Sequence, residues 1–200
     1  MSTLTVHLIN DVGLDSSVTN AIRDRVTLLL SETIRRAKAL GVGIGGITGV
    51  RVLWEPDCIA GCAGQDVVIR FRRPPRGARG FACRSRGDGG WVFNSRGLTT
   101  INGQGTTTLV FVPECSGGGS PPGDVLGSLA FHEFMHNKLQ LGNRLHSRLG
   151  VQLGAASVGP TTPPSDGDVR LLGPHLGDQN PQICVGGRHP QICGPITGMP

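Results

Sequence analysis

The 200-residue sequence contains no tyrosine, and aromatic residues make up only 4% of the chain. Proteins that bind single-stranded nucleic acid stack bases on aromatic side chains, and no nucleic-acid-binding motif is present here. Both absences argue against a nucleic-acid partner. The lack of tyrosine also excludes any hydrolytic mechanism in which a tyrosine hydroxyl stabilises a developing negative charge.

Long apolar runs are absent as well. No stretch approaches about 18 consecutive apolar residues, so the sequence predicts no transmembrane helix and no membrane partner. The first residues, MSTLTVHLIND, have neither a basic start nor an uninterrupted apolar stretch, so they do not resemble a secretory signal peptide. A cytoplasmic location is the default expectation, and export by a non-classical route is the alternative.

Lysine is scarce: the chain has 17 arginines, two lysines and a formal net charge of +5. Seven of the arginines fall within residues 70–86, which contain no acidic residue. In this cluster Arg70 and Arg72 alternate with Ile69 and Phe71, so the two arginines are expected on one face of a strand. A solvated basic face is the ordinary interpretation, and a surface for an acidic substrate or partner is the alternative.

The most informative pattern is H-E-x-x-H, formed by His132, Glu133 and His136 in the segment DVLGSLAFHEFMHNKLQLG. Residues four apart lie on one face of a helix, so the two imidazoles can bind one zinc ion. The glutamate can hold a water molecule beside the ion and act as its base. The pattern therefore predicts Zn²⁺ as cofactor and hydrolysis as reaction. The plainer alternative is a core helix with two satisfied histidines and a surface glutamate.

A catalytic zinc ion needs a third protein ligand. No glutamate lies downstream of the motif, which excludes a downstream Glu in that role. His146 is the best candidate, because a helix that ends at Gly142 can turn back toward the metal. An ordinary surface histidine is the alternative reading of His146. Three aspartates in Pro/Gly-rich chain without a predicted helix also stay open as ligands: Asp166, Asp168 and Asp178.

The run HEFMHNKLQLGNRLHS resembles the metzincin zinc metallopeptidases, whose motif is H-E-x-x-H-x-x-G-x-x-H. It is more similar to a group of small bacterial archaemetzincin-like proteins. In these a longer helix ends in Leu-Gly and the third histidine belongs to a His-Ser pair, as Leu141-Gly142 and His146-Ser147 do here. The resemblance extends loosely over residues 3–150.

This resemblance implies a zincin-like fold and the activity of a zinc metalloendopeptidase on a peptide or protein substrate. It implies that three histidines are the metal ligands and that Glu133 is the catalytic base, taking a proton from water and passing it to the leaving amine. The implied ligands are His132, His136 and His146. His175, an arginine or a backbone N–H is left to assist at the oxyanion.

Two departures from the metzincin pattern are visible. The glycine and the third histidine are displaced by three and four residues, about one helical turn or roughly 5.4 Å of rise. Metzincins also carry a methionine-containing turn beneath the metal, whereas the stretch after His146 reads GVQLGAAS. Leu153 is expected to fill that space, because an apolar side chain of similar volume can replace methionine.

Periodicity predicts an α+β fold with a mixed twisted sheet, a long N-terminal helix and a helix that carries the motif. The predicted strands are 3–10, 49–55, 66–73, 90–95 and 106–112. The predicted helices are 17–40, with an apolar stripe and solvated arginines, and 124–141, with Asp124 as N-cap. In the resembling fold an edge strand binds the extended substrate; residues 106–112 or 90–95 are the candidates.

The chain is expected to divide into a catalytic domain at 1–150 and an irregular Gly/Pro-rich segment at 151–200 that packs on or trails from it. Six cysteines allow 15 pairings. Local disulfides or buried thiols are the ordinary interpretation. A further hypothesis is that a Cys184 or Cys193 thiolate occupies the open metal position and holds the enzyme latent.

Other functions stay open on these residues. One is another zinc-dependent hydrolase or tailoring enzyme on the same fold, since fold and motif do not fix the substrate. A second is a toxin-like effector protease. The third is a non-catalytic zinc-binding module, although a purely structural site has no use for Glu133.

Overall fold

A computed structural model of the chain describes residues 2–54, 65–74, 83–85, 91–93, 97–102, 105–114, 121–155, 158–179, 182–186 and 189–193. In chain order the elements are β1 (Ser2–Asn10), α1 (Ser16–Ala39), β2 (Ile47–Trp54), β3 (Val67–Arg72), β4 (Cys83–Ser85), β5 (Trp91–Phe93), β6 (Gly97–Asn102), β7 (Gly105–Phe111), α2 (Gly123–Leu139), α3 (Asp166–Leu172), β8 (Gln182–Gly186) and β9 (His189–Cys193). Two 3₁₀ helices, η1 (Gly142–Ser147) and η2 (Gly173–His175), follow α2 and α3.

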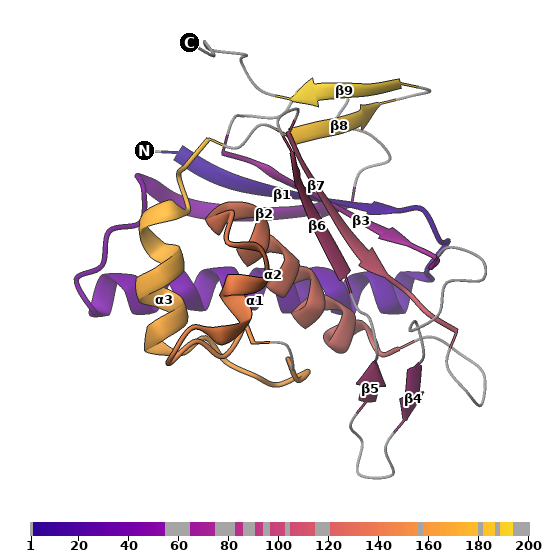
Figure 1. Cartoon of the computed structure of the whole chain (residues 1–200), viewed down its shortest axis with the longest axis horizontal. Coiled ribbons are helices and arrows are strands. Elements are labelled where there is room, and N and C mark those ends of the chain that lie inside the picture. Colours follow the sequence, from indigo (N-terminus) through magenta and orange to yellow (C-terminus); the bar gives the residue numbers. More distant parts are fainter. Residues whose placement is uncertain are drawn as a thin grey trace.

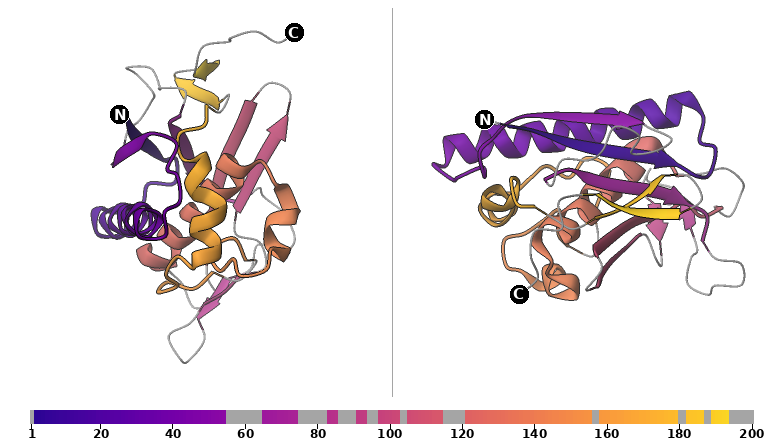
Figure 2. Two further views of the ribbon diagram at one scale, coloured as in Figure 1. Left: turned by 90° about the vertical axis from the view of Figure 1, so that its left-hand side faces the viewer. Right: turned by 90° about the horizontal axis from the view of Figure 1, so that it is seen from above.

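The main sheet is mixed, with the order β2-β1-β3-β7-β8-β9 and with β6 also paired to β7. β1, β2, β3 and β7 run parallel, whereas β6 is antiparallel to β7. Figures 1 and 2 show the helices on one side of this sheet. The fold is therefore mixed α/β, and the five predicted strands and two predicted helices are confirmed within a few residues at each end.

The expected free edge at 106–112 is wrong. β7 pairs with β3 over residues 69–72 and 108–111, and its other side pairs with β6. The other candidate, 90–95, contains β5, which pairs with β4 in a separate two-stranded sheet. Strands β4 and β6 were not predicted from the sequence.

Helix α1 begins where the Asp15 side chain accepts a hydrogen bond from the Val18 backbone N–H, which satisfies one of the free amides of the first turn. The predicted apolar stripe is confirmed as buried: Ile22, Val26, Leu29, Leu30 and Ile34. The expectation that the arginines lie on the solvated side is wrong for Arg25. Its guanidinium is half-buried and donates to Ser128 Oγ at 2.9 Å and to Thr162 O at 2.7 Å.

Helix α2 is buried on nearly every side, lying against α1 and against β6 and β7. Two corrections apply to its ends. It begins at Gly123 with Pro122 in the cap position, so Asp124 lies in the first turn and is not the N-cap. It ends at Leu139, two residues before the predicted end at 141, and Gln140 takes the left-handed conformation (φ 52°).

The prediction of an irregular segment after residue 150 is wrong in part. Ser165 and Asp168 form a capping box that begins α3, which packs against α1 and α2. β8 pairs in parallel with β7 at Thr106 and Gln182, so the described C-terminal strands extend the main sheet. None of the helices in the described ranges is long and apolar enough to cross a membrane.

The basic cluster is partly neutralised. Ile69 and Phe71 are buried, whereas Arg70 and Arg72, which alternate with them, both pair with Asp11. The predicted alternation along β3 is therefore confirmed. Hydrogen bonds from Arg70 and Arg72 hold the pKa of the Asp11 carboxyl below its usual value, although burial opposes them. The side chains of the other clustered arginines, apart from Arg73, lie outside the described residues.

Gly127 tests the close packing of α2 on α1. A Cβ at this position would lie 2.7 Å from the Arg25 Cβ and 3.0 Å from the Ile22 carbonyl oxygen. Alanine favours a helix by about 1 kcal/mol over glycine, but overpacking costs about 1–3 kcal/mol. We expect Gly127→Ala to lower the free energy of unfolding, measured by urea denaturation, by about 1 kcal/mol.

The matched control is Gly43→Ala, where a Cβ meets nothing within 4 Å and φ is not positive. This variant is expected to stay within about 0.5 kcal/mol of the wild type. If Gly127→Ala were the more stable of the two, the helices would not be in contact as described.

Lys138, at the end of α2, is buried and donates through Nζ to the carbonyl oxygens of Gln65 at 2.6 Å and Asp178 at 2.9 Å. Burial lowers its pKa to about 8, against the opposing charges of Asp178 and Asp66. The unfolded chain keeps an ordinary lysine pKa near about 10.4. Between these values the unfolded state binds more protons, so the free energy of unfolding rises with pH.

We therefore expect the protein, kept in a metal chelator, to gain up to about 3 kcal/mol of stability from Lys138 between pH 8 and 10.5. Lys138→Met should remove this rise, and Lys38→Met, which changes the exposed lysine of α1, should retain it. Chemical denaturation at several pH values measures both. Equal pH slopes in the two variants would contradict the prediction.

Candidate metal centre

Helix α2 supplies the first two histidines of the candidate site. His132 and His136 are one helical turn apart, so both rings leave the helix on the same side. Both are buried, as is Glu133 between them in sequence. The ordinary alternative of a surface glutamate is therefore wrong for Glu133, which is 5% exposed.

The chain after α2 turns back and brings in the third histidine. Gln140 and Gly142 both adopt a positive φ of 52°, and the 3₁₀ helix η1 follows directly. Leu145 is buried in the core and anchors η1, while the next residue, His146, is exposed to solvent. The predicted return of the chain toward the motif is thus confirmed, although the turn begins two residues before Gly142.

The three imidazoles converge through their Nε2 atoms. The Nε2–Nε2 distances are 3.1 Å between His132 and His136, 2.9 Å between His136 and His146, and 3.2 Å between His132 and His146. Three nitrogens about 2.05 Å from a tetrahedral zinc ion would be about 3.3 Å apart. The triangle is therefore close to the size that such an ion requires, and each of the three residues offers one ring nitrogen to it.

Hydrogen bonds on the far side of the rings determine which nitrogens face the centre. His132 Nδ1 lies 2.8 Å from the Leu153 carbonyl oxygen. Because a carbonyl only accepts, Nδ1 carries the proton and the Nε2 lone pair points inward. His136 has a hydrogen bond to the backbone of Gly142, which leaves its Nε2 for the centre in the same way.

The protonation state also suits a metal site. Burial, and then the charge of His146, lower the pKa of His136 to about 4, although the hydrogen bond to Gly142 opposes the shift. His136 is therefore neutral near pH 7. Neutral imidazoles with converging lone pairs repel each other unless a cation lies between them, so the donor set fits a divalent ion.

The other predicted ligand candidates are placed elsewhere. Asp166 pairs with Arg36, and the Asp178 carboxylate lies 2.6 Å from His175 Nδ1. Asp168 is buried and accepts hydrogen bonds from backbone amides. None of the three aspartates belongs to the histidine cluster in the described part of the chain. The Cys184 and Cys193 side chains lie outside the described residues, so the hypothesis of a latent thiolate stays untested.

The sequence missed the role of the backbone at Leu153. Its side chain is buried, and the contact with the site is made by its carbonyl oxygen; that Leu153 fills the space of the absent methionine stays a prediction. Nothing in the side-chain pattern identifies such a contact. The start of α3 could have been predicted from the sequence, because Ser165 and Asp168 have the spacing of a capping box.

Comparison with known proteins adds no relative: no family model matches the chain, and no curated protein or solved structure is significantly similar to it.

Metal binding to the folded state should stabilise the protein. At free Zn²⁺ of roughly 100 times Kd, the free energy of unfolding should rise by about 2.7 kcal/mol. His146→Ala should remove most of this increase, since it takes away one of three ligands. His175→Ala is the control, because it removes a partly exposed histidine outside the cluster. Thermal unfolding with and without Zn²⁺ measures the effect, and an undiminished shift in His146→Ala would contradict the assignment.

Proposed function

We propose that this protein is a zinc-dependent metallopeptidase with a zincin-like fold, related in its site to the metzincin group that its motif resembles. One observation carries the proposal. Three histidine Nε2 atoms lie within 3.2 Å of each other, and a buried glutamate follows the first histidine. The proposed ligands are His132, His136 and His146, and the proposed cofactor is Zn²⁺.

The position of Glu133 on α2 supports a catalytic role. At about 100° per residue, its side chain leaves the helix about 60° from His136 and about 100° from His132. It is thus on the side of the helix that carries the ligands. A bound Zn²⁺ would supply the Lewis acidity that makes water nucleophilic near neutral pH and polarises a carbonyl group.

The residues of the chain would do the remaining work. Glu133 would orient the water molecule, accept its proton and deliver that proton to the leaving amine nitrogen. His132 and His136 would be held by their backbone contacts to Leu153 and Gly142, so that the site is organised before substrate arrives. Peptide hydrolysis requires these roles in one place.

The fold supports a peptide substrate. β6 is antiparallel to β7, which is its partner among the described strands, and it contacts α2. An extended substrate could pair with the outer edge of β6 through main-chain hydrogen bonds, beside the helix that carries the motif. β6 therefore replaces the two edge strands expected from the sequence.

The test is Glu133→Gln, assayed with a peptide library for cleavage and with metal analysis for bound zinc. Loss of the general base should lower kcat/KM by about 10²–10⁴. Zinc content should stay unchanged, because Glu133 is not a ligand. Glu32→Gln is the matched control, since Glu32 lies on α1 and pairs with Arg35.

Three outcomes contradict the proposal at different levels. Normal cleavage by Glu133→Gln would remove Glu133 as the base. Zinc binding without any cleavage by the wild type would favour a non-catalytic zinc module. A wild type that binds no divalent ion would overturn the proposed function itself.

A further inference from the structure

Residues 150–154 form a turn whose Leu153 carbonyl oxygen contacts His132. One buried carboxylate holds this turn in place. Asp168 is fully buried, and its Oδ1 accepts hydrogen bonds from the backbone N–H groups of Leu153 at 2.9 Å, Gln152 at 3.2 Å and Gly154 at 3.4 Å. A buried carboxylate is stable only when such donors surround it. The turn and the carboxylate therefore depend on each other.

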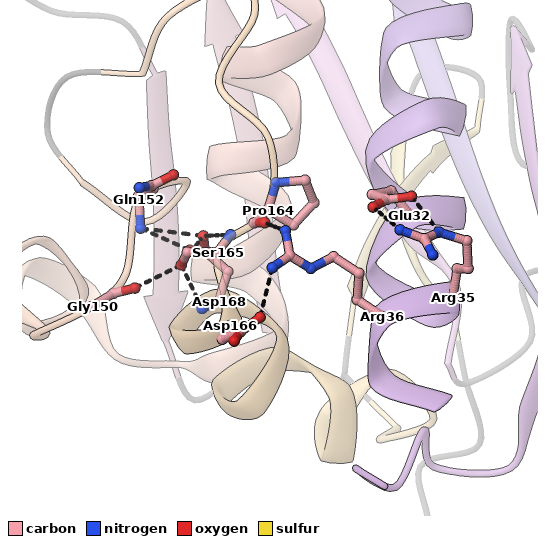
Figure 3. Close-up of polar contacts among 9 residues, drawn as sticks. All are labelled: Glu32, Arg35, Arg36, Gly150, Gln152, Pro164, Ser165, Asp166 and Asp168. Carbon is pink, nitrogen blue, oxygen red and sulfur yellow. Dashed lines mark hydrogen bonds and ion pairs between the residues drawn. The ribbon is translucent and has the colours of Figure 1, made fainter. Parts of the chain in front are cut away.

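The second oxygen of the same carboxylate binds the start of α3. Asp168 Oδ2 accepts from the Ser165 backbone N–H at 2.7 Å and lies 2.6 Å from Ser165 Oγ. That hydroxyl is also 2.6 Å from the Gly150 carbonyl oxygen, at the beginning of the turn. Figure 3 shows Ser165 linked to Gly150 and the Asp168 carboxylate linked to Gln152. The approach is so close that a Cβ at Gly167 would lie 2.2 Å from the Gly150 carbonyl oxygen.

Helix α1 anchors this arrangement. Arg36 donates to the Pro164 carbonyl oxygen and to Asp166 Oδ1, the latter at 2.6 Å, immediately before and within the first turn of α3 (Figure 3). Arg25 donates to the Thr162 carbonyl oxygen at 2.7 Å. The segment that positions the Asp168 carboxylate is thus attached to α1.

The peptide group between Leu153 and Gly154 connects Asp168 to the histidine cluster. Its N–H, on Gly154, donates to Asp168, and its carbonyl oxygen, on Leu153, accepts from His132 Nδ1–H at 2.8 Å. A hydrogen bond at one end of a peptide group polarises the other end, so the carbonyl becomes a better acceptor. The carboxylate therefore acts on the imidazole through one rigid peptide unit.

We propose that Asp168 is a positioning residue for the metal centre: it holds the Leu153 carbonyl in the place that sets the tautomer and orientation of His132. This inference rests on the proposed function, because it assumes that the three histidines bind a divalent ion. It assigns to Asp168 a role beyond the capping of α3. The role is exerted entirely through the turn, without contact with metal or substrate.

The test compares Asp168→Asn with Asp166→Asn by titration of Zn²⁺ against a competing chelator. Both substitutions remove one negative charge from the first turn of α3, and both are nearly isosteric. Only Asp168 contacts the turn. Asp166 is exposed and pairs with Arg36, and the second bond of Arg36, to the Pro164 carbonyl oxygen, does not involve Asp166, so this attachment of α3 is retained in Asp166→Asn. Outer-shell substitutions typically weaken metal binding by about 10–100-fold. We expect Kd for Zn²⁺ to rise by about tenfold in Asp168→Asn and to stay within about twofold of wild type in Asp166→Asn.

A second readout separates positioning from simple stabilisation of α3. The ¹⁵N chemical shifts of the His132 ring in the metal-free protein report which nitrogen carries the proton. Wild type and Asp166→Asn should show a single Nδ1–H form, and Asp168→Asn should show a mixture of tautomers. A helix cap with no effect on His132 would leave these shifts unchanged.

The outcomes are distinct. If the wild type binds no divalent ion, the proposed function and this inference both fall. If the wild type binds Zn²⁺ and folded Asp168→Asn binds it equally well, only the positioning role falls. If Asp168→Asn does not fold, Ser165→Ala replaces it, since that variant removes only the hydroxyl between Gly150 and the carboxylate; wild-type affinity in Ser165→Ala would then overturn the proposal.

Discussion

Helix α2 is enclosed by protein along nearly its whole length, and the candidate metal centre depends on this enclosure. α1 approaches it closely at Gly123 and Gly127, and β6 and β7 cover another side. A side chain in such close-packed surroundings has few alternative rotamers, so the two histidines of α2 stay aimed at one point. Burial also lowers the pKa of His136, and the neutral ring is the form that binds a metal.

The other groups of the site come from the chain after α2. This part of the chain passes the histidine cluster twice. The first passage places His146 on η1, and the second places the Leu153 carbonyl oxygen behind His132. Asp168 closes this stretch by binding the amides of the second passage. A single continuous stretch from α2 to α3 thus carries the three histidines, the Leu153 carbonyl oxygen and Asp168, while α1 and the sheet support this stretch.

Much of this arrangement could be predicted from local pattern. The apolar periodicity of 17–40 and the alternation of 3–10 identify α1 and β1, because each pattern is long enough to exclude other structures. The histidines were also identified correctly as a group, since spacing on a helix and a glycine turn restrict where His146 can lie. The seven-residue helix α3 and the short strand β8 were missed, because neither has enough apolar residues to show a period.

By itself, then, the sequence determined the long elements and the types and spacing of the donor residues, because both are encoded by positions close together in the chain. Only the tertiary structure decided how these donors are oriented. The Leu153 carbonyl, the buried state of Asp168 and the attachment of α3 to Arg36 join residues that lie 15 to 130 positions apart. The contacts at Leu153 and Asp168 each pair a side chain with a backbone group that every residue carries, so no side-chain pattern predicts them.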